Sequence, residues 1–575
     1  MADDLCLPGL VDIQGVNKLP EAHVSEEALM TQAVFGKKPA GADPSTTVIR
    51  SGRHPINVAD ASVQLSGEQE ECISNYLLDS NIKNNNVNTI AQSILEGHTH
   101  EFSLEDIEFI NLKPSAIAKE SFQVLDNYRK GKVRSKEGVL HNQNSSRTLS
   151  GRKLSTEDII RMAGERFIKF SDKKLDGFTS FIHPYDSSLS SLQSEDAKMV
   201  NLAQLLLASA EKVGFKQFDS AEKLLVHCES MVSEIGHPVE RIAFHFSKAL
   251  RERIKTEAAS NTDNIGNDQK RSSGGLPTGV DLTTVVLHQK VPFSKVMQFA
   301  SIQTILDNVA VAKKIHLIDL QIRNGVQWTL LIQALSERKT VPVKLLKITA
   351  IQTSDKERAE EIGKRLQSYA KSMNISFIFK VVSVKNMKDL KVELFNIRHS
   401  EAVAVYSPVV LWAMIGRPED LEILLSVIQR MKPVIMVVME IEANTNSPSF
   451  VNRFIEALFL HSVWFDSLEE CIDRDNQYRT DIERSYFGPG IQNIVAAEGE
   501  NRTTRSVKVD VWRTFFKRFS MVEINIRQAS LDQANMVLKQ KFYCGSSCTI
   551  YKNRKCVMVG WKGTPVNSVS AWKFK

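Results

Sequence analysis

The residues that could serve cofactor chemistry lie in the stretch KKIHLIDLQIRNGVQW, where an apolar run ends at Asp319 and a turn leads into a helical pattern. In open α/β sheets, nucleotide and adenosyl cofactors bind beyond the carboxyl ends of strands, and glycines let the backbone approach them closely. This turn contains Gly325 alone, and the bulky Ile322 and Arg323 occupy the positions of close approach. The turn is therefore poorly suited to hold a cofactor.

The end of the following apolar run lacks the acid that usually binds ribose hydroxyls. The sequence ITAIQTSD presents Gln352 and Thr353 there, with Asp355 three residues late. We therefore expect no bound cofactor and interpret Asp319 as a capping or hydrogen-bonding group that, with His316, organises a strand end. The enzymatic alternative is an S-adenosylmethionine-dependent methyltransferase.

Other reactive side chains lack the partners that catalysis or metal binding requires. Glu440 and Glu442 lie two apart on an expected strand, so they point to opposite faces and are expected to anchor structure. Cys544, Cys548 and Cys556 have no fourth ligand at zinc-site spacing, and cysteines in hairpin strands are commonly packed. The sequence predicts no catalytic residue and no metal ligand.

A basic, aromatic segment, NRTTRSVKVDVWRTFFKRF, supports a third hypothesis, direct sequence-specific DNA binding. Its candidate phosphate contacts are Arg502, Arg505, Arg513, Lys517 and Arg518. In the competing interpretation, its aromatic residues make a surface helix whose charges face water. The net charge of +6 is mild for 575 residues, so it permits nucleic-acid contact without indicating it.

Five apolar runs, each followed by a helical pattern, must position these residues. The runs are 315–320, 345–351, 375–382, 402–407 and 433–441, and the pattern after the third is NMKDLKVELF. Runs of this kind, each joined to the next by one helix, indicate a parallel sheet covered on both faces. SMVEINI and a hairpin about Lys552 to Lys555 give it an antiparallel ending. The predicted fold class is α/β, with a Rossmann-like, methyltransferase-like core at 286–575.

Three amphipathic patterns in residues 196–258 predict a helical cap before this core. The second pattern begins near Asp219 and ends at Gly236, with Val232 and Ile235 facing inward, and the third opens at Pro238. Representative apolar positions of the cap are Leu202, Leu206, Leu224 and Phe246. LAQLL at 202–206 and LEILL at 421–425 match LxxLL, but core packing is the favoured interpretation of both.

Residues 1–190 are rich in Ser, Asn, Asp and Lys and are expected to be mostly disordered, with short helical islands. The clearest island is LSTEDIIRMAGERFIKF, where Ser155 and Asp158 predict a helix start; a smaller one is ECISNYLLDS. We favour helices docked on the main domain over segments that fold on a partner. YRKGKVRSK, 128–136, is either a nuclear-import signal or a solvated charge run.

The cellular compartment is indicated by the lack of a signal-peptide pattern, of a membrane span and of a disulfide framework in the sequence. The N-terminus has acidic residues where a signal peptide would be basic, and no apolar run is long enough for a membrane span. Seven scattered cysteines, an odd number, do not resemble a disulfide framework. We therefore expect a soluble protein with reduced thiols, in the cytosol or nucleus.

The order of segments from Asp196 to Lys575 resembles the plant GRAS family of transcriptional regulators. IHLID resembles the family's VHIID region, and two C-terminal segments, NIVAAEGENRTTRSVKVDVW and VGWKGTPVNSVSAW, supply further landmarks. The matching residues are His316, Ile318, Asp319, Arg502, Arg505, Trp512, Trp561, Ser570, Ala571 and Trp572. Pro489 and Gly490 replace the family's usual Arg-Glu pair. No DELLA motif is visible in residues 1–190, so gibberellin-dependent turnover is not predicted.

The resemblance implies a non-enzymatic transcriptional regulator in the nucleus. Members of the family pair with one another, as homodimers or heterodimers, and with zinc-finger or other DNA-binding factors, so contact with DNA would be indirect. The apolar cap positions named above would pack the cap and offer a surface to a second GRAS protein.

Overall fold

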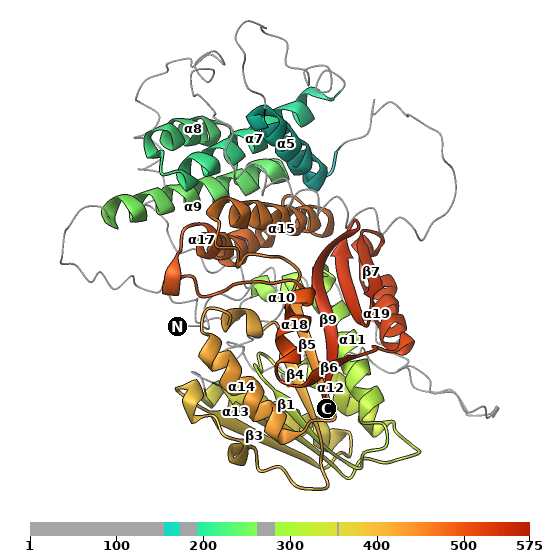
Figure 1. The fold of residues 1–575 in the computed structure, drawn as a ribbon. Helices are drawn as coiled ribbons and strands as arrows, with labels where there is room; N and C mark the ends of the chain where they lie inside the picture. Colours follow the sequence, from blue (N-terminus) through green and yellow to red (C-terminus); the bar gives the residue numbers. More distant parts are fainter. Residues whose placement is uncertain (1–153, 173–191, 261–281, 353–355) are drawn as a thin grey trace, which may run out of the picture. The chain divides into compact units, whose positions relative to one another are not determined.

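In this computed structural model, the described residues are 154–172, 192–260, 282–352 and 356–575 (Figure 1). The predictions for ECISNYLLDS, the basic tract 128–136, Thr353 and Asp355 lie outside them. None of the helices in these ranges is both long and apolar enough to cross a membrane.

The described part of the chain contains one mixed sheet of nine strands, in the order β3-β2-β1-β4-β5-β9-β8-β7, with β6 also paired to β9. The parallel strands are β1 (Lys314–Asp319), β2 (Leu345–Gln352), β3 (Phe377–Ser383), β4 (Ala402–Pro408) and β5 (Ile435–Ile441). The antiparallel strands are β6 (Met521–Ile524), β7 (Cys548–Asn553), β8 (Cys556–Trp561) and β9 (Thr564–Phe574). The predicted parallel core with an antiparallel ending is confirmed.

Helices cover both faces of the sheet. On one face α11 (Phe293–Asn308) contacts α12 (Gln327–Ser336) and α19 (Gln528–Lys541), and α12 contacts α13 (Lys356–Ser372). On the other face α14 (Pro418–Met431) and α18 (Val509–Lys517) pack on a core cluster that includes Val405, Met436 and Trp572. This two-sided burial explains why β1, β2, β4 and β5 are largely apolar, whereas β3 at the edge of the sheet is only partly buried.

The connection from β3 to β4 differs from the prediction. NMKDLKVELF forms two short 3₁₀ turns, η2 (Met387–Asp389) and η3 (Val392–Phe395), and no α-helix. The Asn386 side chain accepts from the Lys388 N–H, and Leu390 between the turns is extended. The apolar spacing reflects the burial of Met387, Leu390 and Phe395. Two separate turns bury these side chains as well as a helix would, so the spacing alone does not predict a helix.

The cap consists of α5 (Thr156–Asp172), α7 (Ser194–Gly214), α8 (Phe218–Ser230) and α9 (Pro238–Ser260). At the start of α5, the Ser155 hydroxyl lies 2.7 Å from an Asp158 carboxylate oxygen, as the helix-start pattern predicts. Because α5 contacts α7 and α15 (Phe450–Cys471), the interpretation of this island as a docked helix is confirmed.

The predicted end of the second cap helix is wrong. The helix stops at Ser230, where the Met231 N–H turns back to the Cys228 carbonyl, six residues before Gly236. Val232 is consequently half-buried and Ile235 is 75% exposed, so neither side chain faces inward.

The cap meets the sheet-bearing part through α15, which contacts α5, α7, α9 and β9. The remaining helical elements are α10 (Leu282–Lys290), η4 (Leu411–Ala413), α16 (Gln477–Ile482), η5 (Glu483–Phe487), α17 (Gly488–Val495), η6 (Gly499–Asn501) and η7 (Tyr543–Ser546). Figure 1 shows α15 and α17 between the cap helices and the sheet.

One carboxylate on α15 joins three segments. Asp466 accepts hydrogen bonds from the Thr156 hydroxyl at 2.9 Å and the Trp561 indole N–H at 2.7 Å. Its second oxygen also lies 2.6 Å from Lys562 Nζ, just after β8. Because Asp466 is only 8% exposed, losing its charge leaves several donors poorly satisfied.

We expect Asp466→Asn to lower the free energy of unfolding by about 2–4 kcal/mol, since an amide cannot satisfy both the Lys562 charge and the indole N–H. Urea denaturation followed by circular dichroism measures the change. Asp475→Asn, on an exposed residue after α15, is the matched control and should shift stability by less than about 0.5 kcal/mol. Equal losses in both variants would refute the joining role of Asp466.

Candidate functional site

The carboxyl ends of β1, β4 and β5 meet at the place where a sheet of this type binds ligands. Asp319, the last residue of β1, is buried; it accepts from the Gln321 N–H at 3.0 Å and from the Trp328 indole N–H at 2.8 Å. Trp328 lies in the first turn of α12, so the carboxylate fastens the turn to the helix that follows. Its predicted hydrogen-bonding role is confirmed.

Arg323 fills the position between β1 and β4. Its guanidinium Nη2 donates to the carbonyls of Pro408 at 3.1 Å and Val409 at 3.3 Å, at the end of β4, and to the Gln321 side chain at 3.1 Å. The side chain is 6% exposed, and the neighbouring Ile322 is 2% exposed. The chain's own residues therefore occupy the place where a cofactor would approach the backbone.

The lone glycine of the turn serves packing. Gly325 has a φ of +73°, and a Cβ added to it would lie 2.6 Å from Ile362 Cγ2 on α13. Glycine is thus required for its left-handed backbone and for contact with the neighbouring helix.

The buried acids of this region have strongly shifted pKa values. Burial raises the pKa of Asp319 to about 7 and that of Glu440 to about 8, while the charge of Arg323 opposes both rises. Glu440 accepts from the Leu411 N–H at 2.9 Å, whereas Glu442 accepts from the Val509 N–H at 3.1 Å. The two glutamates anchor different segments, which confirms the structural interpretation.

His316 lies three residues before the end of β1. Its Nε2 is 2.8 Å from the Thr349 hydroxyl on β2, its Nδ1 is 3.2 Å from a Glu401 carboxylate oxygen, and burial lowers its pKa to about 3. The expectation that His316 and Asp319 organise one strand end is therefore wrong, because His316 binds across the middle of the sheet. Ile318 between them is fully buried in the core.

The candidate phosphate contacts do not form one surface. Arg502 is 5% exposed and donates to the Thr445 carbonyl at 3.3 Å, and Arg505 donates to the Gly499 carbonyl at 2.8 Å. Arg513 donates to both carboxylate oxygens of Glu523 at 2.9 Å each. Among the five, Lys517 and Arg518 are exposed, and Arg518 pairs with Glu422. The expectation that all these charges face water is wrong for Arg502 and Arg513.

The aromatic landmarks of the C-terminal segments are buried. Trp512 stacks on Phe516 with ring centroids 5.4 Å apart, and Trp572 donates its indole N–H to the Ser570 hydroxyl at 2.9 Å. Ala571 pairs with Val437 where β9 meets β5. Trp561, described above with Asp466, is likewise buried. These residues build the sheet and its packing.

The representative cap positions are also interior. Leu202, Leu206 and Phe246 are fully buried and Leu224 is 4% exposed; Phe246 packs edge-on against Phe454 of α15. Any contact with a partner would be made by other residues of these helices. Leu421, Leu424 and Leu425 are buried too, so the core interpretation of both LxxLL matches is confirmed.

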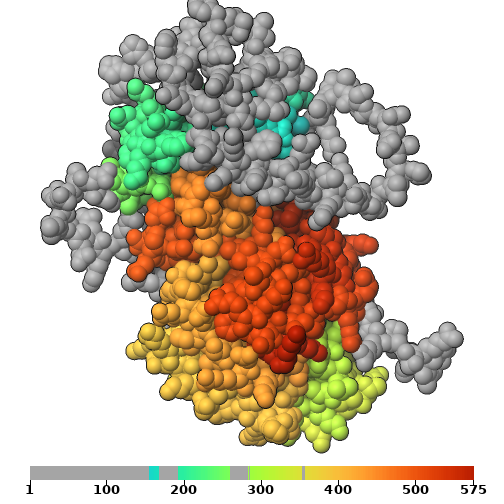
Figure 2. All heavy atoms as spheres, in the orientation of Figure 1, coloured from blue at the N-terminus to red at the C-terminus, as the bar shows by residue number. Residues whose placement is uncertain are grey.

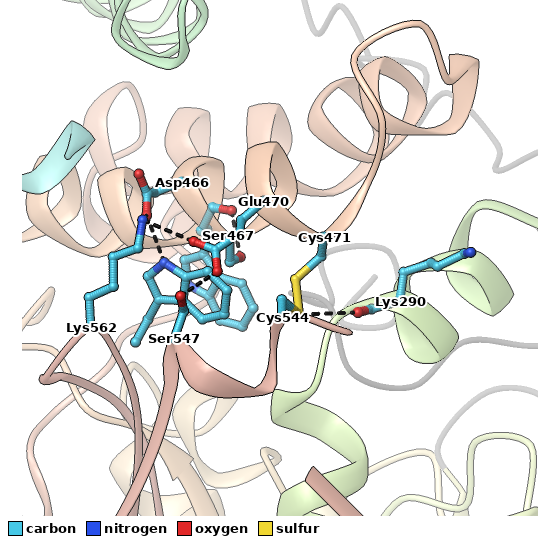
Figure 3. Close-up of a disulfide and its surroundings, with 10 residues drawn as sticks. Lys290, Asp466, Ser467, Glu470, Cys471, Cys544, Ser547 and Lys562 are labelled. Atoms are coloured by element: carbon cyan, nitrogen blue, oxygen red, sulfur yellow. Dashed lines mark hydrogen bonds and ion pairs between the residues drawn. A yellow bond between two sulfur atoms is a disulfide. The ribbon is translucent and has the colours of Figure 1, made fainter. Parts of the chain in front are cut away.

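The expectation that all cysteines are reduced is wrong for one pair. Cys471, the last residue of α15, forms a disulfide with Cys544 in η7 (Figure 3). The two cysteines are 73 positions apart in the sequence, and no local pattern predicts their pairing. Cys548 and Cys556 are packed in the hairpin strands as expected, and the described ranges contain no group of three or more His, Cys, Asp or Glu that could hold a metal.

Pro489 and Gly490, which differ from the expected family pattern, lie at the start of α17. Both residues lie in the first turn of α17, where a proline needs no backbone N–H donor. Gly490 is buried. Pro489 and Gly490 therefore lie at the start of a helix that packs on α9.

The fold and the strand ends define a class of protein: a methyltransferase-like α/β sheet with a helical cap, whose cofactor turn is filled by the chain's own side chains. The model of the GRAS domain family matches residues 202–573, and the chain belongs to this family.

Comparisons with individual proteins agree. The chain is 32% identical over 377 residues to the DELLA protein RGL1 of Arabidopsis thaliana, covering 65% of this chain and 70% of that protein. It is 29% identical to the DELLA protein GAI1 of Vitis vinifera, covering 65% of this chain and 62% of that protein. The crystal structure of SCL7 from Oryza sativa matches with a TM-score of 0.57 and 25% identity, over 65% of this chain and 99% of that one.

The raised pKa of Glu440 predicts a pH dependence of stability. In the unfolded chain the carboxyl titrates near its ordinary value of 4.5, and in the folded chain near 8, so the folded state holds a proton that the unfolded state releases. This stabilisation is fully present below about pH 4.5 and is lost as the pH rises through about 8.

We therefore expect Glu440→Gln, which imitates the protonated acid, to flatten the fall of unfolding free energy between pH 5 and 8, by at most about 1.4 kcal/mol per pH unit. Urea titrations at several pH values measure the slope. Glu360→Gln on the exposed face of α13 is the control and should leave the slope unchanged. If the unfolding free energy of Glu440→Gln fell with pH as steeply as that of the wild type, the raised pKa of Glu440 would be contradicted.

Proposed function

We propose that this protein is a nuclear transcriptional regulator that acts through protein–protein contacts and not through methyl transfer. The observation that carries the proposal is Arg323, which is buried between β1 and β4 with its guanidinium bonded to backbone carbonyls of the strand end. A cofactor at this edge would have to displace a buried, paired charge, at a cost of several kcal/mol. Membership of the GRAS family supports the regulatory role.

The partners we propose are other GRAS proteins and zinc-finger or other DNA-binding factors. DNA would then be reached indirectly, because Arg502, Arg505 and Arg513 make internal contacts with carbonyl or carboxylate oxygens. The sheet-bearing part would carry the DNA-binding factor.

The cap offers the surface for a second GRAS chain. The cap exposes apolar side chains that its own packing does not use: Phe215 at 40%, Val226 at 57% and Ile235 at 75%. Phe215 follows α7, Val226 is on α8, and Ile235 lies in the turn before α9. When a partner covers apolar side chains of this size, the removal of their surface from water stabilises the complex.

A paired substitution tests this surface. Val226→Glu with Ile235→Glu should weaken self-association, or association with a second GRAS protein, at least about tenfold, because two charges would be buried without partners. Analytical ultracentrifugation over a concentration series measures it. Val311→Glu is the matched control, since Val311 is 80% exposed in the turn before β1, away from the cap helices. A wild-type domain that stays monomeric and recovers no DNA-binding factor from nuclear extract would contradict the proposal.

One observation favours direct contact with nucleic acid as a second candidate function. A cleft of about 730 Å³ is lined by cationic residues on α18, in the β7–β8 turn and at the end of the chain, together with the carboxylates of Asp510 and Glu523. The cationic residues include Lys517, Arg554, Lys555 and Lys575. If the cleft binds DNA, Lys517→Glu with Lys555→Glu should lower affinity and reduce the salt dependence, as measured by fluorescence anisotropy of a labelled duplex. Affinity that is sequence-selective and lost in this variant would favour the second candidate over the first.

A further inference from the structure

The disulfide lies at the junction of two elements that are far apart in sequence. Cys471 ends α15, Cys544 lies in η7 just after α19, and their Cα atoms are 5.7 Å apart, a separation typical of disulfides. Cys471 is half-buried, so small reagents can reach one side of the pair, whereas Cys544 is 3% exposed. Figure 3 shows Cys544 directed toward Cys471 at the end of the helix.

The other cysteines in the described ranges are poor candidates for redox chemistry. Cys228, Cys548 and Cys556 are buried, and burial raises the pKa of each thiol to about 12. The thiolate is the reactive form, so these three stay protonated and inert near neutral pH. Thiol oxidation in this part of the chain is thereby confined to one pair.

We propose that Cys471 and Cys544 form a reversible oxidation site that is a dithiol under reducing conditions and a disulfide in the presence of hydrogen peroxide. The proposal rests on the proposed nuclear location only in one respect: disulfides in that compartment are usually transient or redox-sensing. The thiol chemistry itself is a property of the isolated protein.

The reaction balances with one peroxide molecule. The Cys471 thiolate attacks a peroxide oxygen, the O–O bond breaks, and the sulfur becomes a sulfenic acid as the departing hydroxide takes up a proton to give water. The Cys544 sulfur, as its thiolate, then attacks the Cys471 sulfur, forming the S–S bond and releasing a second water once the departing hydroxide is protonated. The two thiols together supply the two electrons that reduce the peroxide. An external dithiol such as dithiothreitol reduces the disulfide back to two thiols.

The fold accommodates both states. In the reduced state the Cys544 thiol has an acceptor nearby, since its sulfur lies 3.8 Å from the Lys290 carbonyl oxygen at the end of α10. Beside the pair, Glu470 bonds to the Ser547 hydroxyl and lies 3.1 Å from Lys562 Nζ (Figure 3). These contacts keep η7 against α15 and hold the two sulfurs within reach when the bond is open.

Oxidation would fasten the end of α15 and the linker that follows it. The linker to α16 begins at Ile472 and contains Arg474, which is 59% exposed and pairs with Glu469. Because a disulfide mainly restrains the open chain, the oxidised form should open less often at this linker. Trypsin cleavage after Arg474 reports that opening.

The test uses the purified full chain, treated with dithiothreitol or with hydrogen peroxide. We expect peptide mapping of the peroxide-treated sample to find a Cys471–Cys544 cross-linked peptide that dithiothreitol removes under native conditions. Cleavage after Arg474 should slow severalfold on oxidation, and the melting temperature should rise by roughly 5 °C.

Variants separate this pair from other thiols. Cys471→Ser and Cys544→Ser should each lose the peroxide-induced changes, and Cys548→Ser, which removes a neighbouring cysteine, should keep them. A cross-link through Cys548, no cross-link at all, or a disulfide that dithiothreitol cannot open in the folded protein would overturn the proposal. None of these outcomes depends on partner binding, so a failure here is distinct from a failure of the regulatory function.

Discussion

The structure depends on α15, a helix that the cap and the sheet must both bury. It is buried on nearly all sides: between Phe450 and Leu468 every residue except Asn452 is buried, the polar ones included. A helix buried in this way needs packing partners all round, and the cap helices α5, α7 and α9 and the strand β9 supply them. Its buried polar side chains need hydrogen-bond partners, and Asp466 finds them in Thr156, Trp561 and Lys562.

The same demand for pairing of buried charge shapes the strand ends. Asp319 and Glu440 are both buried there, and Arg323 is the cation that offsets them. A sheet that bound an adenosyl cofactor would leave this space open and place glycines around it. Here the space is occupied by the Arg323 side chain, which stabilises the fold through its hydrogen bonds to the end of β4.

The sequence predicts the architecture because the central parallel strands β1, β2, β4 and β5 are largely apolar runs buried between helices. β1 to β5, the antiparallel ending and the start of α9 at Pro238 all have local signals. The failures depend on contacts that no local pattern contains. Arg323 pairs with carbonyls 85 and 86 residues away, Cys471 pairs with Cys544 across 73 residues, and His316 bonds to β2. The early end of α8 is a failure of another kind, since apolar spacing continues after the helix has stopped.

We expect the ends of β1 and β4, where Arg323 is buried, not to accept an adenosyl cofactor. Isothermal titration of the purified chain with S-adenosylmethionine, alongside Asp319→Ala, tests it most directly. We expect no saturable heat for either protein at millimolar ligand. Saturable binding to the natural sequence that is lost in Asp319→Ala would contradict this expectation and restore the methyltransferase hypothesis.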